Sequence, residues 1–252
     1  MKKYCVLLLV TFFSLQSCLE NNIGTVNDGL VAWYPLDGDA QDHSGNKLHG
    51  TVLGAKPTED RFGKAKSAFD VTDSSNICLG DILDYVFCEP VAQWSVSGWA
   101  KPRKSGTLHY GAQIVGKSTG RAGTIQWTIG YNNYEVAFGV FSDKDALNYK
   151  TQYIPAELNK WFHFVLIFDG SLPAEVRIKV YVNATPEISR FVERGNLGTS
   201  TENTIQELNI GGHRISPDSK VEHPFNGSVD DIRIYNRAIT NQDVIELYFA
   251  EN

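Results

Sequence analysis

The feature that most constrains the fold is a succession of short runs rich in β-branched and aromatic residues. Clusters of Gly, Asn, Asp or Pro separate these runs. Such a pattern at fairly regular spacing is typical of an antiparallel sandwich or barrel. The predicted strands cover 30–36, 66–71, 76–80, 94–102, 112–117, 123–131, 134–141, 161–170, 175–183, 206–212 and 226–236. A chain of 252 residues is long enough to form one such all-β domain.

Two of the runs alternate cleanly between apolar and polar residues. In 175–183, the valines and the isoleucine occupy even positions, whereas Arg177, Lys179 and Tyr181 occupy odd ones. In 94–102, Trp94 and Val96 face away from Trp99. This period of two predicts half-buried strands.

A single helix is predicted, near the C-terminus. Thr240 followed by Asp243 resembles a capping box, and apolar residues follow it.

The first residues have the composition of a processing segment. Lys2 and Lys3 precede an apolar stretch too short to span a bilayer, and the sequence then reaches Cys18 through a lipobox-like stretch. This predicts a lipoprotein signal peptide over 1–17, a lipidated Cys18, a tether over 18–28 and one domain over 29–252. The alternative is a plain secretory signal. We therefore expect an exported protein that contacts a membrane through its lipid anchor only, at the outer membrane or cell surface.

The overall charge restricts the partners. A formal net charge of −6 without blocks of like charge argues against nucleic acid and against anionic membrane surfaces as ligands.

Two cysteines, Cys78 and Cys88, lie outside the predicted signal peptide and are not the predicted lipidation site, Cys18. In an oxidising compartment an even pair predicts a disulfide, with two buried free thiols as the alternative.

Three sequence patterns typical of catalytic sites can be compared with this chain. Residues 111–118, GAQIVGKS, match the P-loop pattern, and GKSTG matches the nucleophile elbow, but both need a following helix that the sequence does not predict. We interpret 112–117 as a strand and expect no nucleotide ligand. Glu135, Asp143 and Asp145 do not have the spacing of paired glycosidase carboxylates. We therefore predict no catalytic residues.

An acidic turn follows the first predicted strand. Asp37, Asp39, Asp42, Ser44 and Asn46 offer the hard oxygen ligands that calcium prefers. The alternative is a turn held by hydrogen bonds of the Asp and Asn side chains. Two further aspartates, Asp230 and Asp231, lie within the last predicted strand, where a buried carboxylate needs a partner.

Four segments together resemble one known family. The stretches 29–52, 94–102, 161–170 and 225–240 are similar to the opening, central, later and closing strands of laminin-G-like, concanavalin A-like jelly-roll domains. The resemblance implies a two-sheet antiparallel jelly-roll sandwich whose first and last strands lie close together. It also implies a structural Ca²⁺ near that seam, for which Asp37, Asp42 and Asp230 are the candidate ligands, with Asp231 as an alternative. Alternation predicts that one of these last two aspartates points outward and the other towards the core, where Arg233 or backbone N–H groups could replace the metal.

The resemblance further implies a non-catalytic envelope module that binds a glycan or a protein. Sugar recognition uses aromatic platforms with nearby polar groups. The candidate ligand-binding residues surround a predicted hairpin and are Tyr110, Trp127, Tyr131, Asn132, Asn133, Tyr134 and Tyr149. Alternatively, Trp127 belongs to the core and the asparagines to a turn. Carbohydrate binding is the first hypothesis, a protein-interaction or structural module without sugar affinity the second, and a glycoside hydrolase the third.

Overall fold

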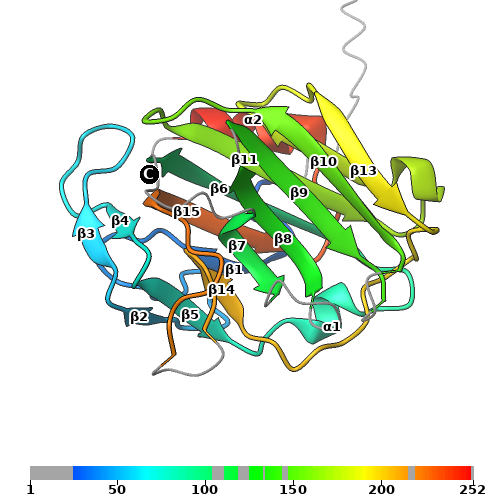
Figure 1. Cartoon of the computed structure of the whole chain (residues 1–252), viewed down its shortest axis with the longest axis horizontal. Coiled ribbons are helices and arrows are strands. Elements are labelled where there is room, and N and C mark those ends of the chain that lie inside the picture. Colours follow the sequence, from blue (N-terminus) through cyan, green and yellow to red (C-terminus); the bar gives the residue numbers. More distant parts are fainter. Residues whose placement is uncertain are drawn as a thin grey trace, which may run out of the picture.

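The computed structural model describes residues 25–103, 111–118, 125–132, 134–143, 147–214 and 219–250. Two antiparallel sheets face each other in these residues (Figure 1). The eight-stranded sheet runs, in spatial order, through β13 (Arg190–Arg194), β10 (Tyr149–Pro155), β9 (Glu135–Phe141), β8 (Ile125–Asn132), β7 (Ala112–Ser118), β14 (Leu208–Ile210), β5 (Asn76–Gly80) and β2 (Thr51–Leu53).

The seven-stranded sheet forms the other layer. Its spatial order is β12 (Ile178–Val182), β11 (Phe162–Asp169), β6 (Gln93–Pro102), β15 (Gly227–Tyr235), β4 (Ala68–Val71) and β3 (Lys56–Thr58), with β1 (Leu30–Tyr34) also paired to β15. The prediction that the first and last strands lie side by side is therefore confirmed. The predicted all-β, two-sheet sandwich with a short C-terminal helix is confirmed as well.

The main core lies between the two sheets. It contains the inward residues of the alternating strands, among them Trp94, Val96 and Trp127. The alternation predicted for residues 175–183 holds over Ile178–Val182. It fails at Val176, which lies in the short 3-10 helix η1 (Ala174–Val176) and is 49% exposed.

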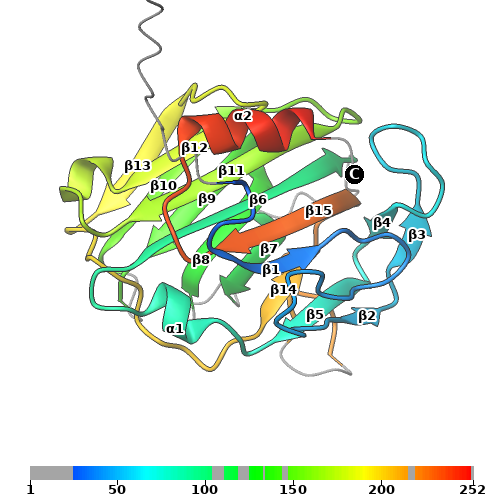
Figure 2. The ribbon, with the colours of Figure 1, turned by 180° about the vertical axis from the view of Figure 1, so that it is seen from behind.

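A second apolar cluster lies on the outer face of the seven-stranded sheet. There α2 (Asn241–Phe249) packs across β11 and β6 (Figure 2), and Val244 and Leu247 meet Val165 and Ile167. The predicted capping box is confirmed, because Thr240 accepts from Asp243 N–H and Asp243 accepts from Thr240 N–H. The other α-helix of the described residues, α1 (Asp84–Phe87), is a single turn that no sequence pattern predicts.

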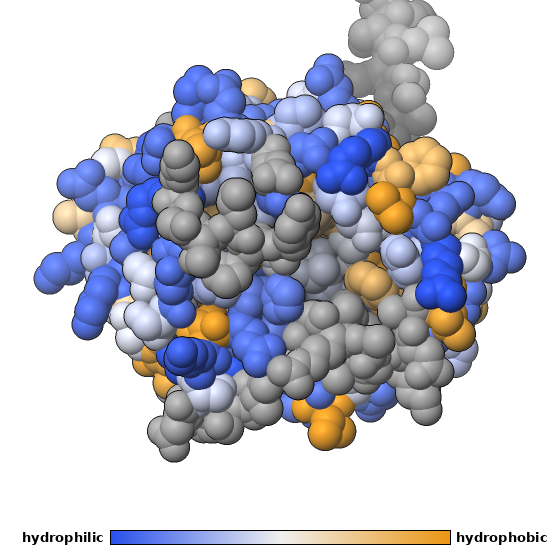
Figure 3. Space-filling model, viewed as in Figure 1, coloured by the Kyte–Doolittle hydropathy of each residue, from blue (hydrophilic) through white to orange (hydrophobic). Residues whose placement is uncertain are grey.

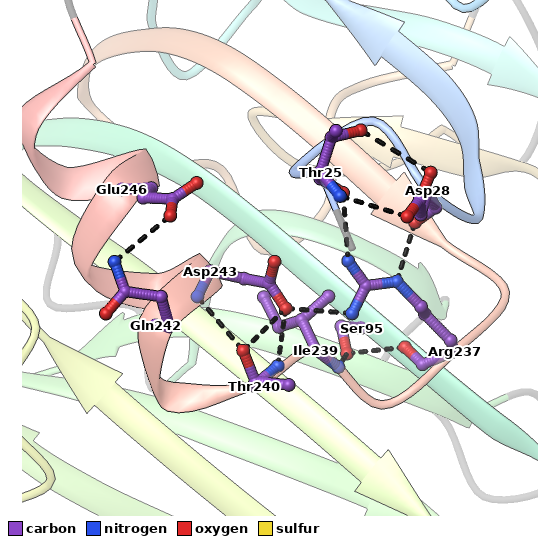
Figure 4. Close-up of polar contacts among 9 residues, drawn as sticks. All are labelled: Thr25, Asp28, Ser95, Arg237, Ile239, Thr240, Gln242, Asp243 and Glu246. Carbon is purple, nitrogen blue, oxygen red and sulfur yellow. Dashed lines mark hydrogen bonds and ion pairs between the residues drawn. The ribbon is translucent and has the colours of Figure 1, made fainter. Parts of the chain in front are cut away.

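The start of the described chain is held beside the start of α2 (Figure 4). The Arg237 guanidinium donates to the backbone oxygens of Thr25 and Asp28 and pairs with Asp243 at 2.8 Å. Ser95, near the start of β6, donates its hydroxyl to Arg237 O. Residue 25 is therefore fixed at the Ser95 end of β6.

No helix among these residues is both long and apolar enough to cross a membrane. On the side of the eight-stranded sheet, hydrophilic residues cover most of the visible described surface (Figure 3).

A buried histidine lies beneath the C-terminal end of α2. The His163 ring lies tilted against Trp99 and Tyr248, with centroid distances of 5.1 and 6.1 Å, and those two rings stack on each other. Burial, reinforced by the positive charges of Arg61 and Arg233, lowers the pKa of His163 to about 3. The imidazole is therefore neutral in the folded protein.

This histidine makes stability depend on pH. Because its pKa is lower in the folded than in the unfolded chain, its contribution is complete above about pH 6.5 and is lost as the pH falls towards 3. We expect His163→Phe to reduce the loss of unfolding free energy between pH 7 and pH 4.5 by about 2 kcal/mol. Urea unfolding of both proteins at the two pH values measures this difference. Equal losses in the two proteins would contradict the assignment.

Candidate functional site

A cleft of about 470 Å³ opens where the β8–β9 hairpin meets the connection from β10 to β11. Its aromatic walls come from Tyr134, in the hairpin, and Trp161, directly before β11. The remaining lining residues are Pro155, Ala156, Glu157, Leu158, Lys160, Phe162 and Asn183. This volume falls within the range of small-ligand pockets.

Backbone hydrogen bonds hold the two sides of the cleft together. Ala156 N–H donates to Tyr134 O at 2.7 Å, and Asn159 N–H donates to Pro102 O at 2.7 Å. The Tyr131 hydroxyl, which is buried, donates to Ala156 O at 2.9 Å. The connection from β10 to β11 is thus tied to the hairpin on one side and to the end of β6 on the other.

Two residues that line the cleft, and Asn159 in the connection beside it, have an unfavourable backbone conformation. Tyr134, Asn159 and Asn183 have φ values of 67°, 59° and 51°, in the left-handed region that favours glycine. Tyr134 is the second residue of a two-residue hairpin connection, since Asn132 pairs with Glu135. Strain of this kind collects at functional sites, where the surrounding structure maintains it.

The polar groups of the cleft are available to a ligand. Glu157 and Lys160 form an exposed ion pair at 2.6 Å. Asn183 Oδ1 accepts from His163 N–H at 3.0 Å, and the side-chain amide nitrogen has no partner in the described part of the chain. With two rings, a carboxylate, an ammonium group and an amide, the cleft can stack on an apolar ring face and hydrogen-bond hydroxyl groups.

The structure brings only part of the predicted ligand-binding set to this cleft. Tyr134 lines it and is 60% exposed, while Tyr131 lies beneath it at 8% exposure. Asn132 is half-buried at the end of β8. Tyr110 and Asn133 lie outside the described residues.

Two predicted ligand residues are elsewhere. Trp127 is fully buried in the main core against Phe87 and Trp94, so its assignment to the ligand surface is wrong. Tyr149 stacks on Phe141 and borders a separate hollow of about 60 Å³. Trp161 was missed because it begins an apolar run and was assigned to a strand.

The acidic turn follows the hydrogen-bonded alternative. The carboxylate of Asp42 accepts from the N–H groups of Trp33, Ser44 and Leu48. Burial opposes ionisation of Asp42, but these N–H groups outweigh it and lower its pKa. Asp37, by contrast, is exposed and lies 3.5 Å from Lys64 Nζ.

The two aspartates of β15 have cationic partners. Asp230 pairs with Arg61 at 2.9 Å, and Asp231 pairs with Arg233 at 3.0 Å and accepts from Trp33 Nε1 at 2.7 Å. The prediction that alternation separates them is wrong. A bulge with φ of 48° at Asp231 interrupts the register of β15, and both aspartates contact groups on the outer face of the sheet.

The predicted calcium ligands have protein partners in the structure. The carboxylates of Asp42, Asp230 and Asp231 accept from protein N–H groups, which are the non-metal partners that the sequence also allowed for buried carboxylates. Among the described residues, no three His, Cys, Asp or Glu side chains gather into a group that could hold a metal ion. Calcium binding stays an untested prediction.

The remaining predicted sites concern cysteines and the P-loop pattern. Cys78 and Cys88 are free thiols, so the predicted disulfide is not formed. Cys78 lies on β5 opposite Thr51 and Asn209, whereas Cys88 follows α1 and contacts Thr201. Cys18 lies outside the described residues. The strand interpretation of the P-loop pattern is confirmed by β7, in which Lys117 is buried against Asp81 and Asp84.

Solved structures of similar fold include several binding domains. One of them is domain 4 of AbnA, an extracellular GH43 arabinanase from Geobacillus stearothermophilus, solved in complex with arabinotriose. Its sequence is 22% identical and its TM-score is 0.61, and the alignment covers 87% of this chain and 98% of that domain. The binding domain of botulinum neurotoxin DC, solved with SialylT, has 14% identity and a TM-score of 0.65. The binding domain of Paraclostridial Mosquitocidal Protein 1 has 16% identity and a TM-score of 0.64. Both alignments cover 89% of this chain and 52% of the other, so this chain matches about half of each of those domains.

No curated protein matches the sequence. The sequence model of one family does match, over residues 72–245, which is more than half of the chain and includes the strands that carry the resemblance from β6 onward. The protein therefore belongs to the concanavalin A-like lectin/glucanases superfamily.

Proposed function

We propose that this protein is a non-catalytic carbohydrate-binding module of the cell envelope and that its ligand occupies the Tyr134–Trp161 cleft. The observation that carries the proposal is the pair of aromatic side chains across one cleft, accompanied by hydrogen-bonding groups. The pyranose ring of a sugar offers an apolar face to such rings and hydroxyl groups to Glu157, Lys160 and Asn183.

The structural neighbours support the same class of ligand. Two of them were solved with sugars, arabinotriose in one case and N-acetylneuraminic acid, on the ligand-binding domain of botulinum neurotoxin serotype D, in the other. At 22% and 15% identity they share the fold. The choice of site therefore rests on the cleft of this chain.

Replacing Tyr134 by glycine separates binding from folding. Glycine removes the aromatic ring but suits the left-handed backbone of this hairpin position. We expect Tyr134→Gly to weaken sugar binding by about tenfold or more, while the free energy of unfolding changes by less than about 1 kcal/mol. A glycan array, followed by calorimetric titration of the best sugar, measures the first effect, and urea unfolding measures the second.

The control for this experiment is a second exposed tyrosine. Tyr85, on α1, is 61% exposed, against 60% for Tyr134, and does not line the cleft. Tyr85→Ala should therefore leave binding unchanged. The array is run in calcium and again in EDTA, which also tests the untested metal prediction. Full sugar affinity in Tyr134→Gly would contradict the assignment of the ligand to this cleft.

One observation favours the second function, a protein-interaction module. Strand β13 forms an edge of the eight-stranded sheet, and all five of its residues are exposed, with Phe191 and Val192 at 56% and 42%. An exposed edge can pair with a strand of another protein. Partner capture that depends on Phe191, together with a glycan array without hits, would favour this alternative.

A further inference from the structure

An ammonium group from outside the lining of the cleft lies over the ring of its tryptophan. Lys101, near the end of β6, places Nζ 5.7 Å from the centroid of the Trp161 ring. The Lys101 ammonium group has no ion pair or hydrogen bond within the described chain, and the residue is half-buried. A ligand on the edge of Trp161 would therefore meet a cation that no protein carboxylate neutralises.

Another ammonium group, that of Lys160, lines the cleft itself. Lys160 pairs with Glu157, but their side chains are 67% and 72% exposed. Ion pairs at such exposed positions contribute little free energy, since water competes for both charges. Lys160 can thus exchange Glu157 for an anionic group of a ligand at small cost.

The positive charge of this cleft contrasts with the rest of the chain. The sequence has a formal net charge of −6, whereas the charged residues that line the cleft are one acid, Glu157, and one lysine, Lys160, to which Lys101 adds a second ammonium group over Trp161. An acidic protein repels anionic ligands over most of its surface, and a local excess of positive charge directs them to one place.

We infer that the cleft prefers anionic sugars, in which a carboxylate or sulfate group meets Lys101 and Lys160 while the ring stacks on Trp161 or Tyr134. This inference rests on the proposed function and adds to it the class of sugar. Charge-assisted hydrogen bonds from ammonium to carboxylate or sulfate oxygens are stronger than those between neutral groups. The anionic group would therefore add both affinity and selectivity.

The test uses pairs of glycans that share a sugar backbone, one member carrying anionic groups and the other neutral. Oligogalacturonate is compared with its methyl ester, and dextran sulfate with dextran, alongside an array of uronic-acid and sulfated glycans with their carboxyl-reduced and desulfated forms. We expect an anionic member to bind about tenfold more tightly than its neutral counterpart. The first pair reports on carboxylates and the second on sulfates. The preference should decrease as sodium chloride is raised.

Variants assign the preference to the two lysines. Lys101→Gln and Lys160→Gln should each lower the affinity for the anionic glycan several-fold and leave that for its neutral counterpart within about twofold. Lys179→Gln is the matched control, because Lys179 is an exposed lysine on β12 whose charge acts on Asp169, at the far end of β11. It should change neither affinity.

Each remaining outcome overturns a defined part of the argument. Equal binding of anionic and neutral partners would overturn the inference and leave the proposed carbohydrate binding intact. Binding to no glycan by the folded protein would overturn both. A preference for anionic glycans that survives both lysine substitutions would show that another surface of the protein recognises the charge.

Discussion

Replacing Trp127 by alanine should lower the free energy of unfolding by about 4 kcal/mol. The side chain is fully buried, and its ring lies 5.4 Å from Phe87 and 5.8 Å from Trp94. Truncation removes the burial of a large aromatic surface and leaves a cavity between rings whose positions are fixed by both sheets. Urea unfolding monitored by circular dichroism measures the loss.

Trp161→Ala is the matched experiment at the cleft. Trp161 is only half-buried, so its truncation should cost much less stability and should weaken glycan binding instead. The two tryptophans therefore separate a core role from a ligand role with the same substitution. A Trp127→Ala protein within about 1 kcal/mol of the wild type would show that the core does not depend on this residue.

Replacing Arg61 by methionine should lower the free energy of unfolding by about 3–5 kcal/mol at pH 8. The Arg61 guanidinium pairs with Asp230, donates to Ala250 O at the end of α2, and lies 4.5 Å from the Trp99 ring centroid. Methionine keeps the apolar contact with Trp99 but leaves the Asp230 carboxylate buried without its cation. A buried charge without a partner is strongly destabilising.

The loss should depend on pH. Burial and the neighbouring Asp231 carboxylate raise the pKa of Asp230 to about 7, against the opposing effect of Arg61. Without Arg61 the pKa should rise further. Because the folded state then holds a proton that the unfolded state has released, the variant should lose stability as the pH rises from 5 to 8, more steeply than the wild type.

Two controls make this prediction specific. Arg61→Met combined with Asp230→Asn removes both charges and should recover part of the loss, since replacing a whole buried pair costs less than removing one partner. Arg194→Met changes an exposed arginine on β13 and should have an effect within about 0.5 kcal/mol. A pH-independent loss in Arg61→Met would contradict the role given to Asp230.

The strands that the sequence predicted share one property, a run of β-branched or aromatic residues long enough to show alternation or continuous burial. The strands it missed are short or polar. Lys56–Thr58 contains a proline, Tyr149–Pro155 has polar residues at most positions, and the edge strand Arg190–Arg194 is exposed throughout. Pairing with neighbouring strands creates these strands, and local composition does not record such pairing.

Only part of the candidate site could be predicted from the sequence, and the reason is related. Tyr134 was identified because a tyrosine beside asparagines at a hairpin tip is conspicuous. Trp161 was not, because its role depends on the connection that brings it opposite the hairpin. The partners of Asp230 were hidden in the same way, since Arg61 is 169 residues away along the chain. The bulge at Asp231 depends on the register between strands, which the local sequence does not specify.

Strand β6 has a practical consequence for handling the protein. Its first residues lie beside the Arg237 contacts that hold residue 25, and its last residues lie beside Trp161 and Asn159. At about 3.3 Å per residue, Ser95 and Lys101 are roughly 20 Å apart. A biosensor chip or bead coupled through the N-terminal end of the domain would thus hold it by the end remote from the cleft, with the mouth facing the bulk solution and accessible to long polysaccharide chains.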